Sequence, residues 1–282
     1  MSGEKSGSDA LNGKAGLGGK LSSNTGITSN LAVPSQSAGK VEISFGSMPD
    51  TNLLRARGHA KTDQTVRWVT RRNDGLYLQS AYGILRISPV ARNIIRLTFA
   101  KGSNLPEEAH PGVALKTPIR EWMYRDSPRL LELKTDDICL QVEKSGGNIH
   151  YMTRDKAPLL SERDKECRLF EKTVQGQALA RLYLEWPKNE NLYALGAGTK
   201  AELSLKGAAR YISHKNGKLP MVVSEKGYGL VVASDGPVCC CAIPNYGTHL
   251  LAEKTELLDW YFIAGKSSAE VISAYKKLTA DS

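Results

Sequence analysis

Short apolar runs separated by turn residues fill the chain after residue 40. The stretch 219–232 reads LPMVVSEKGYGLVV, which is two apolar runs joined by a polar segment that contains glycine. β-Branched residues bounded by glycine and small polar residues are typical of a strand, a turn and a second strand. We therefore predict a β-hairpin here, in which Gly227 and Gly229 supply the backbone freedom of a tight reversal.

More runs of the same kind precede and follow this hairpin. They lie at 41–45, 65–70, 76–80, 84–88, 93–99, 130–133, 138–143, 149–152, 182–186, 193–196, 239–241 and 257–264. Many short strands at hairpin spacing favour an antiparallel sandwich or barrel over an alternating α/β fold. We predict an all-β fold, with one large antiparallel β-sandwich (a supersandwich) over residues 41–282.

The two ends of the chain differ from this pattern. Residues 1–40 consist largely of Gly, Ser, Asn, Ala and Lys, and such a segment buries too little apolar surface to offset its ordering entropy, so we predict a disordered tail. Near the other end, Ser267–Glu270 has the pattern of a capping box. Val271, Tyr275 and Leu278 then share one helical face, which predicts a C-terminal helix docked on the sandwich.

Charge and cysteine content exclude several classes of protein. The net charge of +9 comes from scattered basic residues with no zinc-finger or aromatic-basic pattern, so we predict no nucleic-acid partner. The five cysteines include the run Cys239–Cys241, which fits neither a disulfide framework nor a metal-ligand spacing. We predict buried free thiols, with Cys239 and Cys241 on one side of a strand and Cys240 on the other.

No apolar run has the length of a membrane span, and we expect a cytoplasmic protein without membrane partner, metal or cofactor.

The order of several segments is similar to the N-terminal β-sandwich domain of glycoside hydrolase family 31. LYALGAG at 192–198 resembles the family's FYGLGE/Q segment, and the predicted hairpin resembles its IPFLVSSKGYGLLWD. ELLDWYFIAG at 256–265, with the helix after it, resembles the end of that domain. Further matching segments lie at 93–98, 135–149 and 203–207, so that the resemblance covers about residues 75–279.

This resemblance implies a galactose mutarotase-like sandwich that packs on a catalytic (β/α)8 barrel, in cis or in trans, and shapes a cleft for an α-glucoside or α-xyloside. The family's two catalytic aspartates lie in the barrel. No residue here matches them, so we assign no catalytic residue, and enzymatic activity of this chain alone stays an open question. The chain also departs from the family at Ala197–Gly198, which replace the family's Glu or Gln after GLG, and it lacks an aspartate in the loop 205–210.

Two alternatives remain open: a stand-alone carbohydrate-binding module and a mutarotase or epimerase. A mutarotase needs a Glu and a His, for which His150 and His214 are candidates, although His150 in a strand is typical of a structural histidine. Carbohydrate modules stack sugar rings on exposed aromatic side chains. Trp122 and Tyr124 beside a loop, and Tyr246 in a glycine-bounded turn, are the predicted sugar-binding residues.

Overall fold

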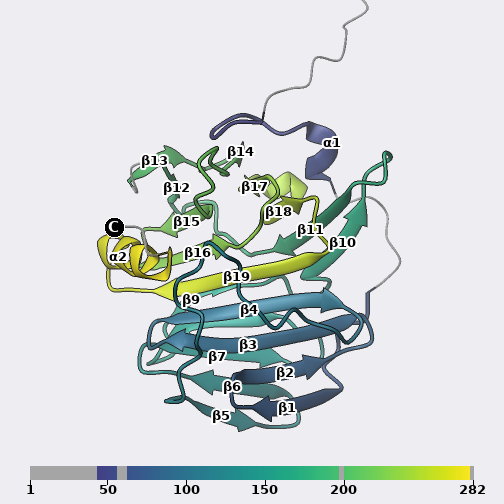
Figure 1. Cartoon of the computed structure of the whole chain (residues 1–282), viewed down its shortest axis with the longest axis vertical. Helices are drawn as coiled ribbons and strands as arrows, with labels where there is room; N and C mark the ends of the chain where they lie inside the picture. Colours follow the sequence, from purple (N-terminus) through teal and green to yellow (C-terminus); the bar gives the residue numbers. More distant parts are fainter. Residues whose placement is uncertain (1–42, 56–61, 197–199, 280–282) are drawn as a thin grey trace, which may run out of the picture. The chain divides into compact units, whose positions relative to one another are not determined.

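Three antiparallel sheets build the fold (Figure 1). The computed structural model describes residues 43–55, 62–196 and 200–279, and residues 42–282 belong to one structural unit. The tail predicted at 1–40 lies outside the described residues. The prediction of a large antiparallel β-sandwich with a C-terminal helix is confirmed.

The largest sheet has nine strands, which come from both ends of the described chain. In spatial order they are β1 (Trp68–Arg72), β2 (Gly75–Gln79), β3 (Gly83–Ala91), β4 (Ile94–Lys101), β19 (Leu257–Ala264), β16 (Tyr228–Val232), β15 (Met221–Ser224), β12 (Leu192–Leu195) and β13 (Ala201–Ser204). β4 and β19 therefore join an N-terminal meander to the segment that contains the hairpin.

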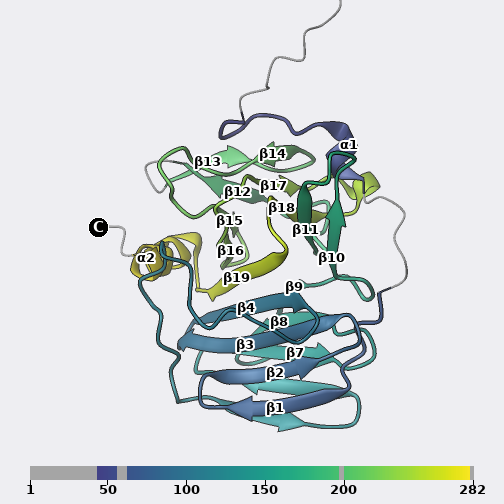
Figure 2. The same cartoon turned by 45° about the vertical axis from the view of Figure 1, so that its right-hand side comes forward.

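Two five-stranded sheets pack against one face of this large sheet. One contains β5 (Met123–Asp126), β6 (Leu130–Lys134), β7 (Ile138–Glu143), β8 (Ile149–Thr153) and β9 (Pro158–Ser161). The other contains β10 (Arg168–Lys172), β11 (Ala178–Tyr183), β18 (His249–Glu253), β17 (Val238–Cys241) and β14 (Ala209–Tyr211). Figure 2 shows β7 and β8 behind β2–β4.

The main core lies between the large sheet and the two smaller ones. Alternate residues of each strand point into it, so that Leu76 and Leu78 of β2 and Leu85 and Ile87 of β3 all belong to one buried cluster. The cysteine strand follows the same rule, as predicted. Cys240 joins this core, whereas Cys239 and Cys241 join a second cluster on the other side of their sheet, and all five thiols are free and buried.

The predicted hairpin is β15–β16, and its two glycines have different physical tasks. Gly227 has a φ of +84°, in the left-handed region that glycine adopts without strain, and its amide donates to the carbonyl of Ser224. Gly229 instead permits close packing, because a Cβ there would lie 2.2 Å from Met221 Cε and 2.8 Å from Val271 Cγ1. The turn is a structural element, and Gly229 brings the C-terminal helix close to the sheet.

That helix, α2 (Ser268–Thr279), packs on the face of the large sheet that is turned away from the main core. Ser267 caps it as predicted, since the Glu270 amide donates to Ser267 Oγ at 3.3 Å, and Glu270 reaches back one residue farther than in a standard capping box, where its Oε2 accepts from the Lys266 amide at 2.9 Å. Val271 and Leu278 are fully buried against strands of the sheet. No helix within the described ranges is long and apolar enough to cross a membrane.

Two local predictions differ from the structure. Residues 43–45, part of the strand predicted at 41–45, form a turn with Gly46 in place of a strand, since Ser47 Oγ donates to the Ser44 carbonyl at 2.6 Å. A short helix that the sequence analysis missed, α1 (Thr51–Leu54), follows this turn, and Asp50 caps it by accepting from the Asn52 amide. A one-turn 3₁₀ segment, η1 (Pro244–Tyr246), precedes β18.

Candidate functional site

The face of the nine-stranded sheet that is turned away from the main core, here called the outer face, has two chemically different halves. Under α2 it is apolar and consists of residues such as Met221, Val223, Val231 and Ile263. Over β1–β4, here called the open half, it carries polar side chains. Their register places Tyr77, Arg86, Thr98 and Asp259 directly opposite one another across β2, β3, β4 and β19.

Asp259 lies at the boundary of the two halves and holds a buried network. Arg96 donates to both of its carboxylate oxygens, from Nε at 2.9 Å and from Nη2 at 2.8 Å, and Thr98 Oγ1 donates to Oδ1 at 3.2 Å. Arg86 Nη2 donates to Thr98 Oγ1 at 3.4 Å. All four residues are at most 5% exposed, so the network carries two guanidinium groups and one carboxylate below the protein surface.

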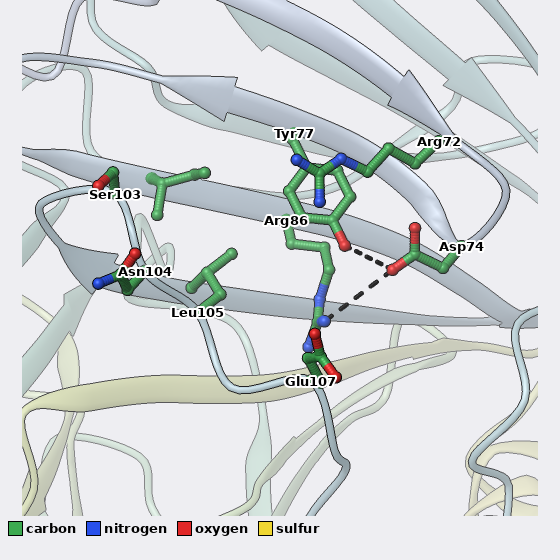
Figure 3. A pocket seen from close by; sticks show the side chains of 9 residues that line it. Arg72, Asp74, Tyr77, Arg86, Ser103, Asn104, Leu105 and Glu107 are labelled. Carbon is green, nitrogen blue, oxygen red and sulfur yellow. Dashed lines mark hydrogen bonds and ion pairs between the residues drawn. The ribbon is translucent and has the colours of Figure 1, made fainter.

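A cavity of about 640 Å³ opens above the open half (Figure 3). Its floor comes from the sheet and its opposite wall from the loop that follows β4. The lining residues are Arg72, Asp74, Tyr77, Ile84, Arg86, Ser103, Asn104, Leu105 and Glu107. The lining therefore combines guanidinium and carboxylate groups, one amide and hydroxyls with the apolar side chains of Ile84 and Leu105.

Asp74 orders the polar groups of the cavity floor. Tyr77 Oη donates to Asp74 Oδ2 at 2.5 Å, and Arg86 Nη1 lies 4.0 Å from the same oxygen. Burial, together with the bond to Asp74, raises the pKa of Tyr77, so that the phenol stays a donor. The Arg72 guanidinium lies over the Tyr77 ring, 4.3 Å from its centroid, and covers that ring face. Figure 3 shows these side chains around the cavity, where they come from β1, the turn between β1 and β2, β2 and β3.

The loop that forms the opposite wall is tied down on both sides of the cavity. Gln79 Nε2 donates to the Gly102 carbonyl at 3.1 Å, and Arg96 Nη2 donates to the Glu108 carbonyl at 3.0 Å. Farther along, the Ala114 amide donates to the Leu278 carbonyl of α2 at 2.7 Å. The segment 103–107 therefore spans the cavity between two fixed points.

The structure brings two of the three predicted sugar-binding residues together. Trp122 and Tyr124 lie with ring centroids 6.2 Å apart, and the Arg71 guanidinium lies 4.9 Å and 5.3 Å from the two rings. Trp122 is only 8% exposed and belongs to the main core, whereas Tyr124 is 39% exposed. A cavity of about 270 Å³ beside Trp122 is lined by arginine and asparagine side chains.

Tyr246 lies apart from this pair, in η1. It is half-buried against the cluster that contains Cys239 and Cys241, and the Arg55 guanidinium lies 5.5 Å from its ring centroid. A role of Trp122, Tyr124 and Tyr246 in sugar binding stays a prediction.

The histidines named as candidate bases are held by neighbouring groups. His150 contacts Glu143 Oε1 through Nε2 and Ser161 Oγ through Nδ1, both at 2.9 Å. His214 Nε2 lies 2.8 Å from the Leu195 carbonyl. Within residues 43–55, 62–196 and 200–279, no group of three or more His, Cys, Asp or Glu side chains is arranged to hold a metal ion.

Trp68 is an exposed aromatic residue that the sequence analysis did not select. It is 66% exposed, and it pairs with Gln79 across β1 and β2. Gln79 in turn pairs with Ile84, which lines the cavity, so Trp68 and the cavity share the outer face. Its neighbour Val69 points to the main core instead. Trp68 and Val69 are adjacent apolar residues in the sequence, and only the strand register shows that Trp68 is the one on the outer face.

Comparison with known proteins identifies enzymes that share this fold. No protein-family model and no curated protein sequence matches the chain significantly. Among solved structures, a glycoside hydrolase family 31 α-xylosidase from a soil metagenome, complexed with xylose, matches 76% of this chain with a TM-score of 0.63 and 17% identity. A family 31 dextranase from Flavobacterium johnsoniae, complexed with isomaltotriose, matches 78% with a TM-score of 0.63 and 14% identity. A cycloalternan-forming enzyme from Listeria monocytogenes, complexed with a pentasaccharide, matches 76% with a TM-score of 0.58 and 17% identity.

These matches cover only part of each enzyme. The chain spans 34% of the α-xylosidase, 28% of the dextranase and 22% of the cycloalternan-forming enzyme. At such low identity the likeness shows a shared fold. It agrees with the family resemblance that the ordered segments of the sequence indicated.

Proposed function

We propose that this chain acts as the non-catalytic β-sandwich domain of a family 31-type glycoside hydrolase. The observation that carries the proposal is the fold shared with the α-xylosidase and the dextranase over about three quarters of this chain and 34% and 28% of those enzymes. The ordered sequence segments that resemble the family support it independently. In this role the sandwich packs on a (β/α)8 barrel, in the same polypeptide or in a partner, and shapes a cleft for an α-glucoside or α-xyloside.

The state of the buried carboxylates supports a non-catalytic role. Retaining glycoside hydrolysis needs two carboxyl groups about 5 Å apart that face each other across the sugar. Here Asp259 is paired with Arg96, Glu162 with Arg168, and Glu190 with Lys226, Ser224 and Tyr228. Each of these carboxylates contributes to internal packing and is bound to groups of the fold.

A stand-alone carbohydrate-binding module is the second candidate, favoured by the polar cavity over the open half. A mutarotase receives less support, because His150 is bound through both ring nitrogens. The two leading candidates make different predictions about a catalytic partner.

The test is purification of the tagged chain from its native cells, followed by identification of attached polypeptide and assay of aryl α-xyloside and aryl α-glucoside hydrolysis. We expect a barrel sequence, either continuous with the tagged chain or associated with it, and hydrolysis that depends on the barrel. Recovery of the chain without any barrel sequence would contradict this proposal and favour the stand-alone module.

A further inference from the structure

We propose that the open half of the outer face binds a neutral oligosaccharide, with Trp68 as the stacking platform and the cavity beside it as the hydrogen-bonding site. The ligand class follows from the function proposed above, whereas the site follows from the geometry of this chain. Nothing in the sequence resemblance assigns a role to these residues.

Trp68 is the exposed member of the four tryptophans. All four lie in the described ranges, and their exposed fractions are 66% for Trp68, 8% for Trp122, 6% for Trp186 and 1% for Trp260. A large ring held outward on an edge strand provides a flat surface for the apolar face of a pyranose. Tyr77 does not serve this purpose, because Arg72 covers a face of its ring.

The distance from Trp68 to the cavity suits a short saccharide chain. Trp68, Gln79 and Ile84 stand directly opposite one another on β1, β2 and β3. Two antiparallel strand spacings separate Trp68 from Ile84, which is roughly 10 Å between their Cα atoms. A sugar stacked on Trp68 therefore places its neighbouring residue over the cavity that Ile84 lines.

The polar lining favours a neutral polyhydroxyl ligand over an ion. Two guanidinium groups, Arg72 and Arg86, stand against two carboxylates, Asp74 and Glu107, so that neither sign of charge is in excess. Arg86 is 4% exposed and its Nε has no hydrogen-bond partner among the described residues. Nε itself is out of reach of solvent, but the Arg86 side chain lines the cavity, where a sugar hydroxyl oxygen is a suitable acceptor for the other N–H groups of the guanidinium.

Asp74 adds a matching acceptor that is already oriented. Its Oδ2 is fixed by Tyr77 and Arg86, and its side chain is 40% exposed and lines the cavity. Adjacent hydroxyls of a pyranose present a donor and an acceptor together. Asp74 and Arg86 therefore form a complementary pair for such a diol, and Asn104 and Ser103 of the loop line the other side of the same cavity.

Trp68 itself reports on the binding. Since the other tryptophans are buried, iodide quenches chiefly the Trp68 fluorescence of the intact chain, and isomaltotriose bound at this site shields it. We expect isomaltotriose to reduce quenching. We expect Asp74→Ala, which keeps the reporter, to weaken this protection about tenfold, the effect of losing one charge-assisted hydrogen bond. Asp126→Ala on β5 is the matched control and keeps full protection.

Calorimetry with the same trisaccharide tests the platform. Trp68→Ala is expected to weaken binding about tenfold, as loss of an aromatic contact does, whereas Val174→Ala, at a position that is 77% exposed and lies in the turn between β10 and β11, leaves it unchanged. Thermal unfolding checks that both variants remain folded. The inference is wrong if isomaltotriose does not protect Trp68, if Val174→Ala weakens binding as much as Trp68→Ala, or if glucuronate protects Trp68 better than the neutral sugar does.

These outcomes are separate from the test of the proposed function. A chain without a barrel partner that still shields Trp68 with isomaltotriose retains this site and loses only the proposed enzyme context. A chain with a barrel partner and no shielding loses the site alone.

Discussion

The two halves of the outer face belong to one continuous sheet but differ in what covers them. Met221, Val231 and Ile263 are apolar and sealed by α2, which closes on them because Gly229 has no side chain. Tyr77 and Arg86 lie a few strands away and line a cavity whose opposite wall is a loop. The helix-covered half maximises burial, whereas the open half keeps oriented polar groups that a purely structural surface does not need. The contrast identifies the open half as the place for binding.

The largest effect is expected at Asp259, the boundary between the halves. Asp259→Ala leaves the Arg96 guanidinium buried without its counter-charge, which costs about 4 kcal/mol of unfolding free energy. Asp235→Ala is the matched control, since its side chain is 95% exposed and its contact with His110 contributes about 0.5 kcal/mol or less. Urea denaturation of both variants measures the difference. Similar losses in the two variants would contradict the boundary network.

A slightly smaller effect is expected in the helix-covered half. Leu278→Ala removes a fully buried side chain between α2 and the sheet, and it is expected to cost about 3 kcal/mol. Leu130→Ala, at a position 37% exposed, is the control and is expected to cost much less. The measurement is again the free energy of unfolding. Equal costs would show that α2 is not docked as described.

In the open half, Tyr77→Phe is expected to cost about 1 kcal/mol of unfolding free energy, because Asp74 loses the hydroxyl that it accepts from.

The contribution of Tyr77 to stability depends on pH in a definite direction. The pKa of Tyr77 is raised above 10.0 by burial and by Asp74, so its contribution to stability is complete below pH 10 and is lost as the pH rises through the raised value. Thermal unfolding recorded across this pH range should therefore show a smaller loss of stability above pH 10 for Tyr77→Phe than for the parent chain. The exposed Tyr124→Phe serves as control, and an unchanged alkaline profile for Tyr77→Phe would be the contrary result.

The smallest effect on stability is expected for Trp68→Ala, despite the size of the residue. Its side chain is 66% exposed, so the substitution should change the unfolding free energy by about 0.5 kcal/mol or less. Together with the predicted loss of isomaltotriose binding, this separates a binding role from a packing role. A loss comparable to that of Leu278→Ala would mean that Trp68 packs on the fold.

The sequence predicted the sandwich, the β15–β16 hairpin, the helix with its cap and the two faces of the cysteine strand, because each depends on local alternation or local capping. The open half depends on long-range register instead. Arg96 and Asp259 lie 163 residues apart, and no local pattern places them side by side. For the same reason Trp122, expected to be exposed beside a loop, lies in the core, whereas Trp68 in a predicted strand lies outside.

Hydrogen exchange of the intact chain, with and without isomaltotriose, compares the two halves in one measurement. We predict slower amide exchange at 68–79 and 101–108, on both sides of the cavity, and unchanged exchange in α2 at 268–279. Protection confined to α2 or to the segments around Trp122 and Tyr246, or no protection at all, would contradict the assignment of the open half as the sugar-binding surface.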